Sequence, residues 1–408
     1  MRQELLRKIA DSTPWLGQVM ARLVAIPALG PDNGGEGEMA KAVYLTSVLE
    51  ELGLRIERVD APDPRVKEGV RPNLLAWWEG QGPGCFALSH MDVVPPGDLS
   101  LWDSDPYVMR REGSLLYGRG VSDNHSGMMA SLLALKAIKE MNLPWRGRAG
   151  VALVSDEETS SRHGLQYLLH RKPGFFTPAD LLLVPDSGES DGGFIEIAEK
   201  SILWLKVEVL GRQAHGSIPH MGINALYASA LMIAEIYNVR ARFSQTDELF
   251  HPPQSTMEPT RKEAGVENVN TIPGRDVFYI DCRILPGINL EEVEQAFRQA
   301  FAVIAARVGV SFTLTPVQKL AAPPGTSSQA PVVRALQSAI ARVRGAEARV
   351  GGIGAGTVAA FFRARGLPVA VWNTDHGVAH MPNEWVDMND IIKDAQVMAL
   401  LYTGRWED

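Results

Sequence analysis

Apolar and polar residues alternate along the first two hundred residues in a way that predicts helices and strands in turn. The predicted helices have apolar positions three and four residues apart and lie at 38–53, 126–142 and 164–171. The predicted strands are short apolar runs at 55–60, 73–80, 85–89, 149–155 and 180–185. This alternation is typical of a mostly parallel sheet with helices on both faces, so we expect an α/β fold.

The pattern changes near residue 200. The segments that follow predict a strand, a helix, a strand, a helix and a strand, at 201–211, 224–238, 277–285, 290–309 and 311–317. Two helices among antiparallel strands make a compact α+β unit of the ferredoxin-like type. The first pattern then resumes with a helix at 332–345, a strand at 368–373 and a closing helix. We therefore expect one domain made of residues 1–198 and 319–408, with residues 199–318 inserted as a smaller domain.

Composition narrows the class of partner. The 408 residues include 40 Lys and Arg against 48 Asp and Glu, a net charge of -8, which argues against a general affinity for nucleic acid or anionic membranes. No apolar run approaches the roughly 18 residues that a membrane span needs, and the first residues do not resemble a secretion signal. Cys85 and Cys282 lie in apolar stretches, as free buried thiols do. We expect a cytoplasmic protein that acts on a small molecule.

Acidic residues and histidines follow three of the predicted strands. These residues are His90 and Asp92, then Asp156, Glu157 and Glu158, then Asp186, joined by Asp123 before a helix and by His376 and His380 after a late strand. The carboxyl ends of parallel strands meet at one edge of the sheet, so we expect these side chains to converge. Clustered carboxylates mixed with histidines suit zinc, or cobalt or manganese.

Each of these groups has a simpler interpretation when taken alone. A histidine at a strand end is more often a polar cap, and acidic residues commonly begin a helix. Asp186 before a serine and a glycine suits a turn, and the late histidines suit a solvated loop. All of them at one sheet edge is a much less common coincidence, which favours a metal site.

A set of motifs in the right order gives the chain a family resemblance. The motifs are "SHMDVVPPG", "WDSDPY", "YGRGVSDN", "SDEETSS", "VPDSG", "GRQAHGSIPHMGINAL", "VNTIPGRDVFYIDCR" and "AHMPNEWV", between about residues 85 and 390. Together they resemble the dinuclear zinc amidohydrolase and peptidase family of acetylornithine deacetylase, succinyl-diaminopimelate desuccinylase, aminoacylase and carboxypeptidase G. The resemblance implies a metal-binding catalytic domain, an inserted dimerisation domain and two divalent metal ions in each chain.

The resemblance also implies which residues bind the metals. His90 and Asp186 would bind one ion, Glu158 and His380 the other, and Asp123 would bridge the two.

Two acidic residues have implied roles beside the metals. Asp92 would hydrogen-bond the far ring nitrogen of His90 and fix its tautomer. Glu157 would be the general base, which takes a proton from the attacking water and passes it to the leaving amine. Successive side chains of a strand face opposite ways, so Glu157 and Glu158 must lie in a bend for both to reach the site.

The inserted domain and a late glycine-rich loop would supply the remaining site residues. The resemblance implies that His215 reaches across a dimer interface to stabilise the oxyanion, and that Asn270, Arg283, Gly354 and Gly356 contact the substrate. His215 is alternatively an ordinary loop histidine, and Arg283 alternatively a structural ion-pair partner of Asp281.

Two positions depart from the family pattern. His125 stands where the family often has a lysine, and it suits either the start of a helix or an approach to the site. The glycine-rich loop lacks the aspartate that is common in the family, which weakens any transfer of substrate preference. The loop is also a poor dinucleotide motif, because Thr357 occupies a position that needs glycine or alanine.

These observations predict a metal-dependent hydrolase of an amide bond, with an N-acyl amino acid as the expected substrate and a homodimer as the expected assembly. A dipeptidase, aminopeptidase or carboxypeptidase using the same site is the alternative within the enzyme class. A metal-bound binding protein without catalysis is the alternative outside it.

Overall fold

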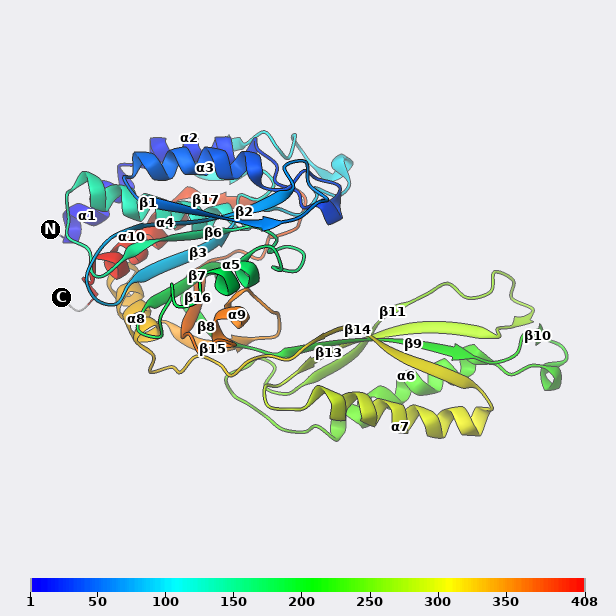
Figure 1. The fold of residues 1–408 in the computed structure, drawn as a ribbon. Coiled ribbons are helices and arrows are strands. Elements are labelled where there is room, and N and C mark those ends of the chain that lie inside the picture. The colour runs from blue at the N-terminus through cyan, green and yellow to red at the C-terminus, as the bar shows by residue number, and fades with distance from the viewer. Residues whose placement is uncertain (1, 407–408) are drawn as a thin grey trace. The chain divides into compact units, whose positions relative to one another are not determined.

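The computed structural model describes residues 2–406, which form two compact units (Figure 1). The first unit contains the chain up to Ile197, then Thr326–Gly351 and the chain from Phe361 onward. The second contains Ala198–Gly325 and Gly352–Ala360. The glycine-rich segment thus lies with the inserted unit, because the amide N of Gly352 donates to the carbonyl oxygen of Leu249 over 2.6 Å and that of Lys200 to Ile353 over 3.0 Å.

A mixed eight-stranded sheet forms the centre of the first unit, in the order β1-β2-β6-β3-β7-β16-β8-β15. The four central strands pair in parallel and the pairs β1/β2, β2/β6 and β16/β8 are antiparallel. Its strands are β1 (Arg55–Pro62), β2 (Val70–Trp78), β3 (Cys85–His90), β6 (Ala149–Val154), β7 (Leu181–Glu189), β8 (Phe194–Glu199), β15 (Arg349–Ile353) and β16 (Val369–Thr374). The predicted α/β fold with a mostly parallel sheet is confirmed.

The helices of this unit contact the large sheet or one another (Figure 1). They are α1 (Arg2–Ala10), α2 (Thr13–Val24), α3 (Met39–Glu51), α4 (His125–Glu140), α5 (Leu165–Arg171), α8 (Pro331–Arg344), α9 (Ala359–Arg363) and α10 (Met388–Thr403), with the short 3-10 turns η1 (Pro31–Asn33) and η2 (Leu99–Leu101). A small sheet of β4 (Arg110–Glu112), β5 (Leu115–Tyr117) and β17 (Trp385–Asp387) completes the unit. Sequence reasoning missed these three strands, since three residues are too few to show a period.

Close packing positions α4 against the strands that carry the acidic residues. Nearly every residue of α4 is buried, including its first turn, and β3 and β6 are buried along their whole lengths. Gly127 permits this approach, because a Cβ there would lie 2.1 Å from the carbonyl oxygen of Pro185 in β7. Asn124, the residue before α4, also donates from Nδ2 to the carbonyl oxygen of Pro185 over 2.6 Å, which ties the start of α4 to β7.

The second unit has the ferredoxin-like order of strands and helices. Its four-stranded antiparallel sheet has the order β11-β13-β9-β14, and α6 and α7 pack against it and against each other. The elements are β9 (Ser201–Leu210), α6 (Ala225–Ala241), β11 (Thr256–Lys262), β13 (Arg275–Ile284), α7 (Leu290–Val308) and β14 (Ser311–Leu320), with β10 (Ala214–His215), β12 (Thr271–Ile272) and η3 (Pro219–Met221) nearby in the chain.

Alternation along β9 shows why this sheet is covered on one side. Leu203, Leu205 and Val207 are fully buried, whereas Trp204 between them is 38% exposed. Residues two apart share a face of a strand, so one face packs on the helices and the other does not.

Asn289 begins α7 by accepting a hydrogen bond from the amide N of Glu291. Within residues 2–406, none of the helices is long and apolar enough to cross a membrane.

Candidate active site

The predicted ligand residues of the first unit lie together at one edge of the large sheet. β3 ends at His90, opposite Val154 at the end of β6, and β7 carries Asp186. Asp123 lies two residues before α4, and His380 lies in the loop before β17. Parallel pairing of β3 with β6 and β7 brings these segments to the same edge, as the strand-end argument predicted.

The Asp123 carboxylate lies between the two histidines. Its Oδ1 is 2.9 Å from Nε2 of His90, and its Oδ2 is 3.0 Å from Nε2 of His380. Asp186 lies on the His90 side, 3.5 Å from Nε2, and Glu158 lies on the His380 side, 3.1 Å from Nε2. One carboxylate therefore faces two separate histidine and carboxylate pairs through its two oxygens.

Glu157 and Glu158 occupy a turn directly after β6, so the structure has the bend that these neighbours require. A ligand atom of Glu157 lies within 4.8 Å of those of His90 and Asp186. Among the described residues, the carboxylate of Glu157 has no hydrogen bond or ion pair. Glu157 is thus the uncommitted acid of the cluster.

Asp92 supports both His90 and this turn. Nδ1 of His90 donates to the main-chain carbonyl oxygen of Asp92 over 3.0 Å, and the nearer carboxylate oxygen of Asp92 is 3.6 Å away. The carboxylate instead accepts hydrogen bonds from the amide N of Glu157, over 3.1 Å, and of Glu158, over 3.0 Å. The expected support of the far nitrogen comes from the main chain, and the side chain holds the two glutamates.

The acidic cluster raises the pKa of both of its histidines. Burial works against charge on His90, but Asp186 and Asp123 outweigh it and raise its pKa well above the usual value. Hydrogen bonds to Asp123 and Glu158 raise the pKa of His380 to about 10. Burial also raises the pKa of Glu158 to about 7, despite its hydrogen bond to His380. Such a cluster of acids demands positive charge.

The donor set fits a divalent cation. His90, Asp123 and Glu158 place one ligand atom each within 4.8 Å of one another, and so do His90, Glu157 and Asp186. Oε1 of Glu158 is buried without a hydrogen-bond partner, so this carboxylate has an acceptor oxygen left for a cation. Imidazole nitrogens mixed with carboxylate oxygens are ligands for zinc and its neighbours in the first transition row.

A buried ionic network supports the turn that carries Glu157 and Glu158. Sequence reasoning missed this network. Asp156 has a left-handed backbone (φ 64°) immediately before Glu157. Nη1 of Arg71 donates to its carboxylate over 2.7 Å, and Nε of Arg71 donates to Glu38 over 3.0 Å. The side chains of Arg71 and Glu38 are completely buried. Nothing in the local sequence marks Glu38 or Arg71 as partners of the acidic motif.

A buried glutamate, also missed, organises the segment before α4. Glu384 accepts hydrogen bonds from the amide N of Gly120, Ser122 and Asp123 and from Nη1 of Arg119. Glu384 belongs to the motif "AHMPNEWV". Its place in this motif was the one feature of the sequence that could have marked Glu384 as a site residue.

His125 and His376, the two histidines that the sequence singled out beside the ligands, have other partners. His125 begins α4, is buried, and its Nε2 lies 2.8 Å from Nζ of Lys41. Burial lowers the pKa of Lys41 to about 7 and that of His125 well below its usual value. His376, a strand-end candidate, hydrogen-bonds Asp390 through Nε2 over 2.9 Å.

The other predicted site residues belong to the second unit. His215 is exposed and its Nδ1 lies 2.8 Å from Oγ of Ser217, while the amide N of Gly216 donates to the carbonyl oxygen of Asn270 over 2.6 Å. His215 and Asn270 are therefore neighbours.

Arg283 and the glycine-rich loop form a second group in this unit. Nε of Arg283 donates to Asp281 over 2.7 Å, and its Nη1 donates to the carbonyl oxygen of Gly354 over 3.0 Å. The ion pair with Asp281 that the sequence left as an alternative is thus present. Gly356 lies near Ile202, since a Cβ on it would be 3.5 Å from the Ile202 side chain.

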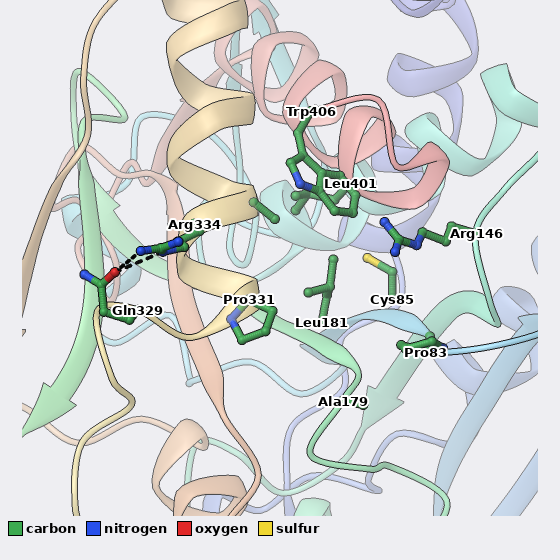
Figure 2. Close-up of a pocket in the computed structure, with 12 residues that line it drawn as sticks. Pro83, Cys85, Arg146, Ala179, Leu181, Gln329, Pro331, Arg334, Leu401 and Trp406 are labelled. Carbon is green, nitrogen blue, oxygen red and sulfur yellow. Dashed lines mark hydrogen bonds between the residues drawn. The ribbon is translucent and has the colours of Figure 1, made fainter. Parts of the chain in front are cut away.

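A cavity of the first unit lies at the end of β3 opposite to His90 (Figure 2). It has a volume of about 530 Å³ and is lined by Cys85, which begins β3, and by two arginines, Arg146 and Arg334. Figure 2 shows the guanidinium of Arg334 hydrogen-bonded to Gln329. His90 ends the same strand, roughly 16 Å away at the usual strand rise, so this cavity is separate from the acidic cluster.

Comparison with known proteins identifies the family. The family model described as peptidase family M20/M25/M40 matches residues 87–403. The chain belongs to this family. It is a metal-dependent hydrolytic enzyme that binds divalent metal, from a family whose members act on peptides or acyl amino acids.

Individual relatives agree with this assignment. The chain is 36% identical to an uncharacterized metallohydrolase of Methanococcus maripaludis, over 96% of this chain and 99% of the relative. It is 30% identical to the succinyl-diaminopimelate desuccinylase of Paracoccus denitrificans, over 73% of this chain and 75% of the relative. The crystal structure of human carnosine dipeptidase 1 has the same M20 fold, with a TM-score of 0.75 and 16% identity over 100% of both chains.

Proposed function

We propose that this M20 enzyme hydrolyses the amide bond of an N-acyl amino acid. Each chain would use two divalent metal ions, for which zinc is the first choice. The observation that carries the proposal is the position of Asp123, whose two oxygens face His90 and His380 at 2.9 and 3.0 Å. A carboxylate in that position suits a bridge between two cations. His90 and Asp186 would hold one ion, and Glu158 and His380 the other.

Glu157 is the proposed proton carrier. Burial raises its pKa well above the usual value, with Asp186 and Glu158 adding to the effect, so this carboxyl holds a proton more readily than a solvated glutamate does. Its side chain has no competing partner within the described chain. Divalent metal, when bound, polarises the carbonyl and makes water more acidic. Glu157 would take the proton of the attacking water and deliver it to the leaving amine.

Residues of the second unit complete the proposal. His215, exposed on its own chain, would stabilise the oxyanion in a partner subunit of a homodimer. Arg283, oriented by Asp281 and by Gly354, would bind the substrate together with Asn270, Gly354 and Gly356. We also propose a cytoplasmic location, where both cysteines, buried and free, remain reduced.

Amine release from a panel of N-acyl amino acids and dipeptides tests the function. The zinc-loaded wild-type protein should release amine from acyl amino acids, in line with the desuccinylase among the relatives. Glu157→Gln should bind the same amount of zinc and lose roughly 10²- to 10⁴-fold in rate. A clear preference for dipeptides would replace the deacylase by a peptidase, and near wild-type turnover in Glu157→Gln would refute the role of Glu157.

Complementation tests the dimer. His215→Ala and Glu157→Gln should each be nearly inactive alone. Mixed dimers should recover roughly a quarter of wild-type activity after random pairing, because one of their two sites has both residues intact. An active monomer by light scattering, or no recovery in the mixture, would refute the action of His215 across an interface.

A further inference from the structure

The two histidines of the acidic cluster are supported by different parts of the fold. His90 ends a strand that is buried along its whole length, and its side chain is 2% exposed. His380 lies in the loop between β16 and β17, with a left-handed backbone (φ 65°) and a side chain that is 55% exposed. The sheet therefore fixes one histidine, whereas the other depends on contacts made by its loop.

Glu384 ties this loop to the segment that carries Asp123. Its side chain is completely buried. Oε1 accepts hydrogen bonds from the amide N of Ser122 over 2.8 Å and from that of Asp123 over 3.1 Å. Oε2 accepts from the amide N of Gly120 over 3.0 Å and from Nη1 of Arg119 over 2.7 Å. A carboxylate has about four lone-pair sites, so these donors occupy them all, and a glutamine would leave some of the donors without an acceptor.

Arg119 extends the connection to His380. Nη2 of Arg119 donates to the carbonyl oxygen of His380 over 3.4 Å, and the guanidinium lies 5.2 Å from the centre of the Trp102 ring. The amide N of Gly118 also donates to the carbonyl oxygen of Glu384 over 3.0 Å. The loop from His380 to Glu384 is thus bound at both of its ends to the segment before α4.

We infer that Glu384 is a positioning residue that sets the separation of Asp123 and His380, and thereby the affinity of the His380 site for its ion. The inference rests on the proposed two-ion site. Oδ2 of Asp123 and Nε2 of His380 are 3.0 Å apart, and Glu384 holds the segments of both residues. Partners that orient metal ligands contribute roughly 10- to 100-fold in affinity. The ion beside His90 and Asp186 depends on Glu384 less, because β3 and β7 carry those ligands.

Zinc titration against a fluorescent chelator, on protein stripped of metal, tests this inference. Glu384→Gln keeps the side-chain volume but only one acceptor oxygen, and one of the two ions should bind roughly 10- to 100-fold more weakly. His380→Ala should lose that same ion, and adding Glu384→Gln to His380→Ala should leave the remaining ion nearly unchanged. Glu384→Asp keeps both oxygens on a shorter side chain and should fall between Glu384→Gln and wild type. If Glu384→Gln does not fold, Glu384→Asp carries the same comparison.

Asp180→Asn is the matched control. Asp180 is another buried carboxylate of this unit that accepts hydrogen bonds from the main chain, from the amide N of Gly84 over 2.5 Å and of Thr177 over 2.7 Å. It lies just before β7, at the end of that strand away from the cluster. Asp180→Asn should lower the free energy of unfolding while both ions bind as in wild type. Equal weakening of both ions in Glu384→Gln, or wild-type affinity for both, overturns the inference.

The two proposals fail in different ways. Absence of amine release from every acyl amino acid, with two ions bound and the selective effect of Glu384→Gln intact, overturns the proposed reaction and leaves the role of Glu384 standing. Amine release by an enzyme whose two ions are insensitive to Glu384→Gln overturns the inference alone. A wild-type chain that binds only one ion overturns the two-ion site and the inference together.

Discussion

Replacement of Arg71 tests the buried network behind the acidic turn. The side chains of Arg71 and Glu38 are 0% exposed and that of Asp156 is 1% exposed. Arg71→Met keeps much of the side-chain volume but leaves two buried carboxylates without their cation. Removal of one partner from a buried ion pair costs about 3–5 kcal/mol. Typical domains have about 5–15 kcal/mol of stability in total, so the loss should be large.

Urea denaturation followed by circular dichroism, on protein stripped of metal, would measure this loss. Arg55→Met is the matched control, because Arg55 pairs with Glu79 at the surface with both side chains more than half exposed (67% and 59%). The control should change the free energy of unfolding by about 1 kcal/mol or less.

The dependence on pH separates charge from packing. Burial raises the pKa of Glu38 even with Arg71 present, and loss of Arg71 removes two hydrogen bonds that oppose the rise. A carboxyl with a folded-state pKa above its unfolded value destabilises the fold as the pH rises from the unfolded toward the folded pKa. The deficit of Arg71→Met should therefore be larger at about pH 8 than at about pH 5. A loss below about 1 kcal/mol at both pH values would refute the reasoning.

Three further predictions concern the metal site, the packing of α4 and the two cysteines. Asp123→Asn should lose most of its bound metal in elemental analysis after gel filtration, and wild-type stoichiometry would contradict the bridging position. Gly127→Ala should lower stability by about 1–3 kcal/mol in the same urea assay, because its Cβ would meet the carbonyl oxygen of Pro185, and an unchanged midpoint would show that the helix shifts freely. Cys85 and Cys282 should resist a thiol reagent until urea is added, since burial raises the pKa of both thiols, and rapid labelling of the folded protein would contradict that burial.

The convergence of the acidic cluster was predictable because it depends on local pattern. Apolar runs mark β3, β6 and β7, and parallel strands present their carboxyl ends at one edge, so residues at those ends meet. The bend at Glu157 and Glu158 follows from the two-residue period of a strand. Asp281 and Arg283, two residues apart on one face of β13, were a foreseeable pair for the same reason.

The partners that hold these residues in place are of a different kind. Arg71 is 33 residues from Glu38 and 85 from Asp156, and Lys41 is 84 residues from His125. No periodicity of the sequence links such distant positions. Each of these charged residues, considered by itself, would be expected on the solvated surface.

For this chain the sequence alone determined the fold class, the metal-binding chemistry and the family, since these depend on residue type and on spacing within or between neighbouring elements. Tertiary structure alone decided that Asp92 supports the glutamate turn through its carboxylate, and that Arg71 pairs with both Glu38 and Asp156. The physical reason is that pairing and desolvation of charge depend on which distant segments pack together. Only the folded chain brings those segments into contact.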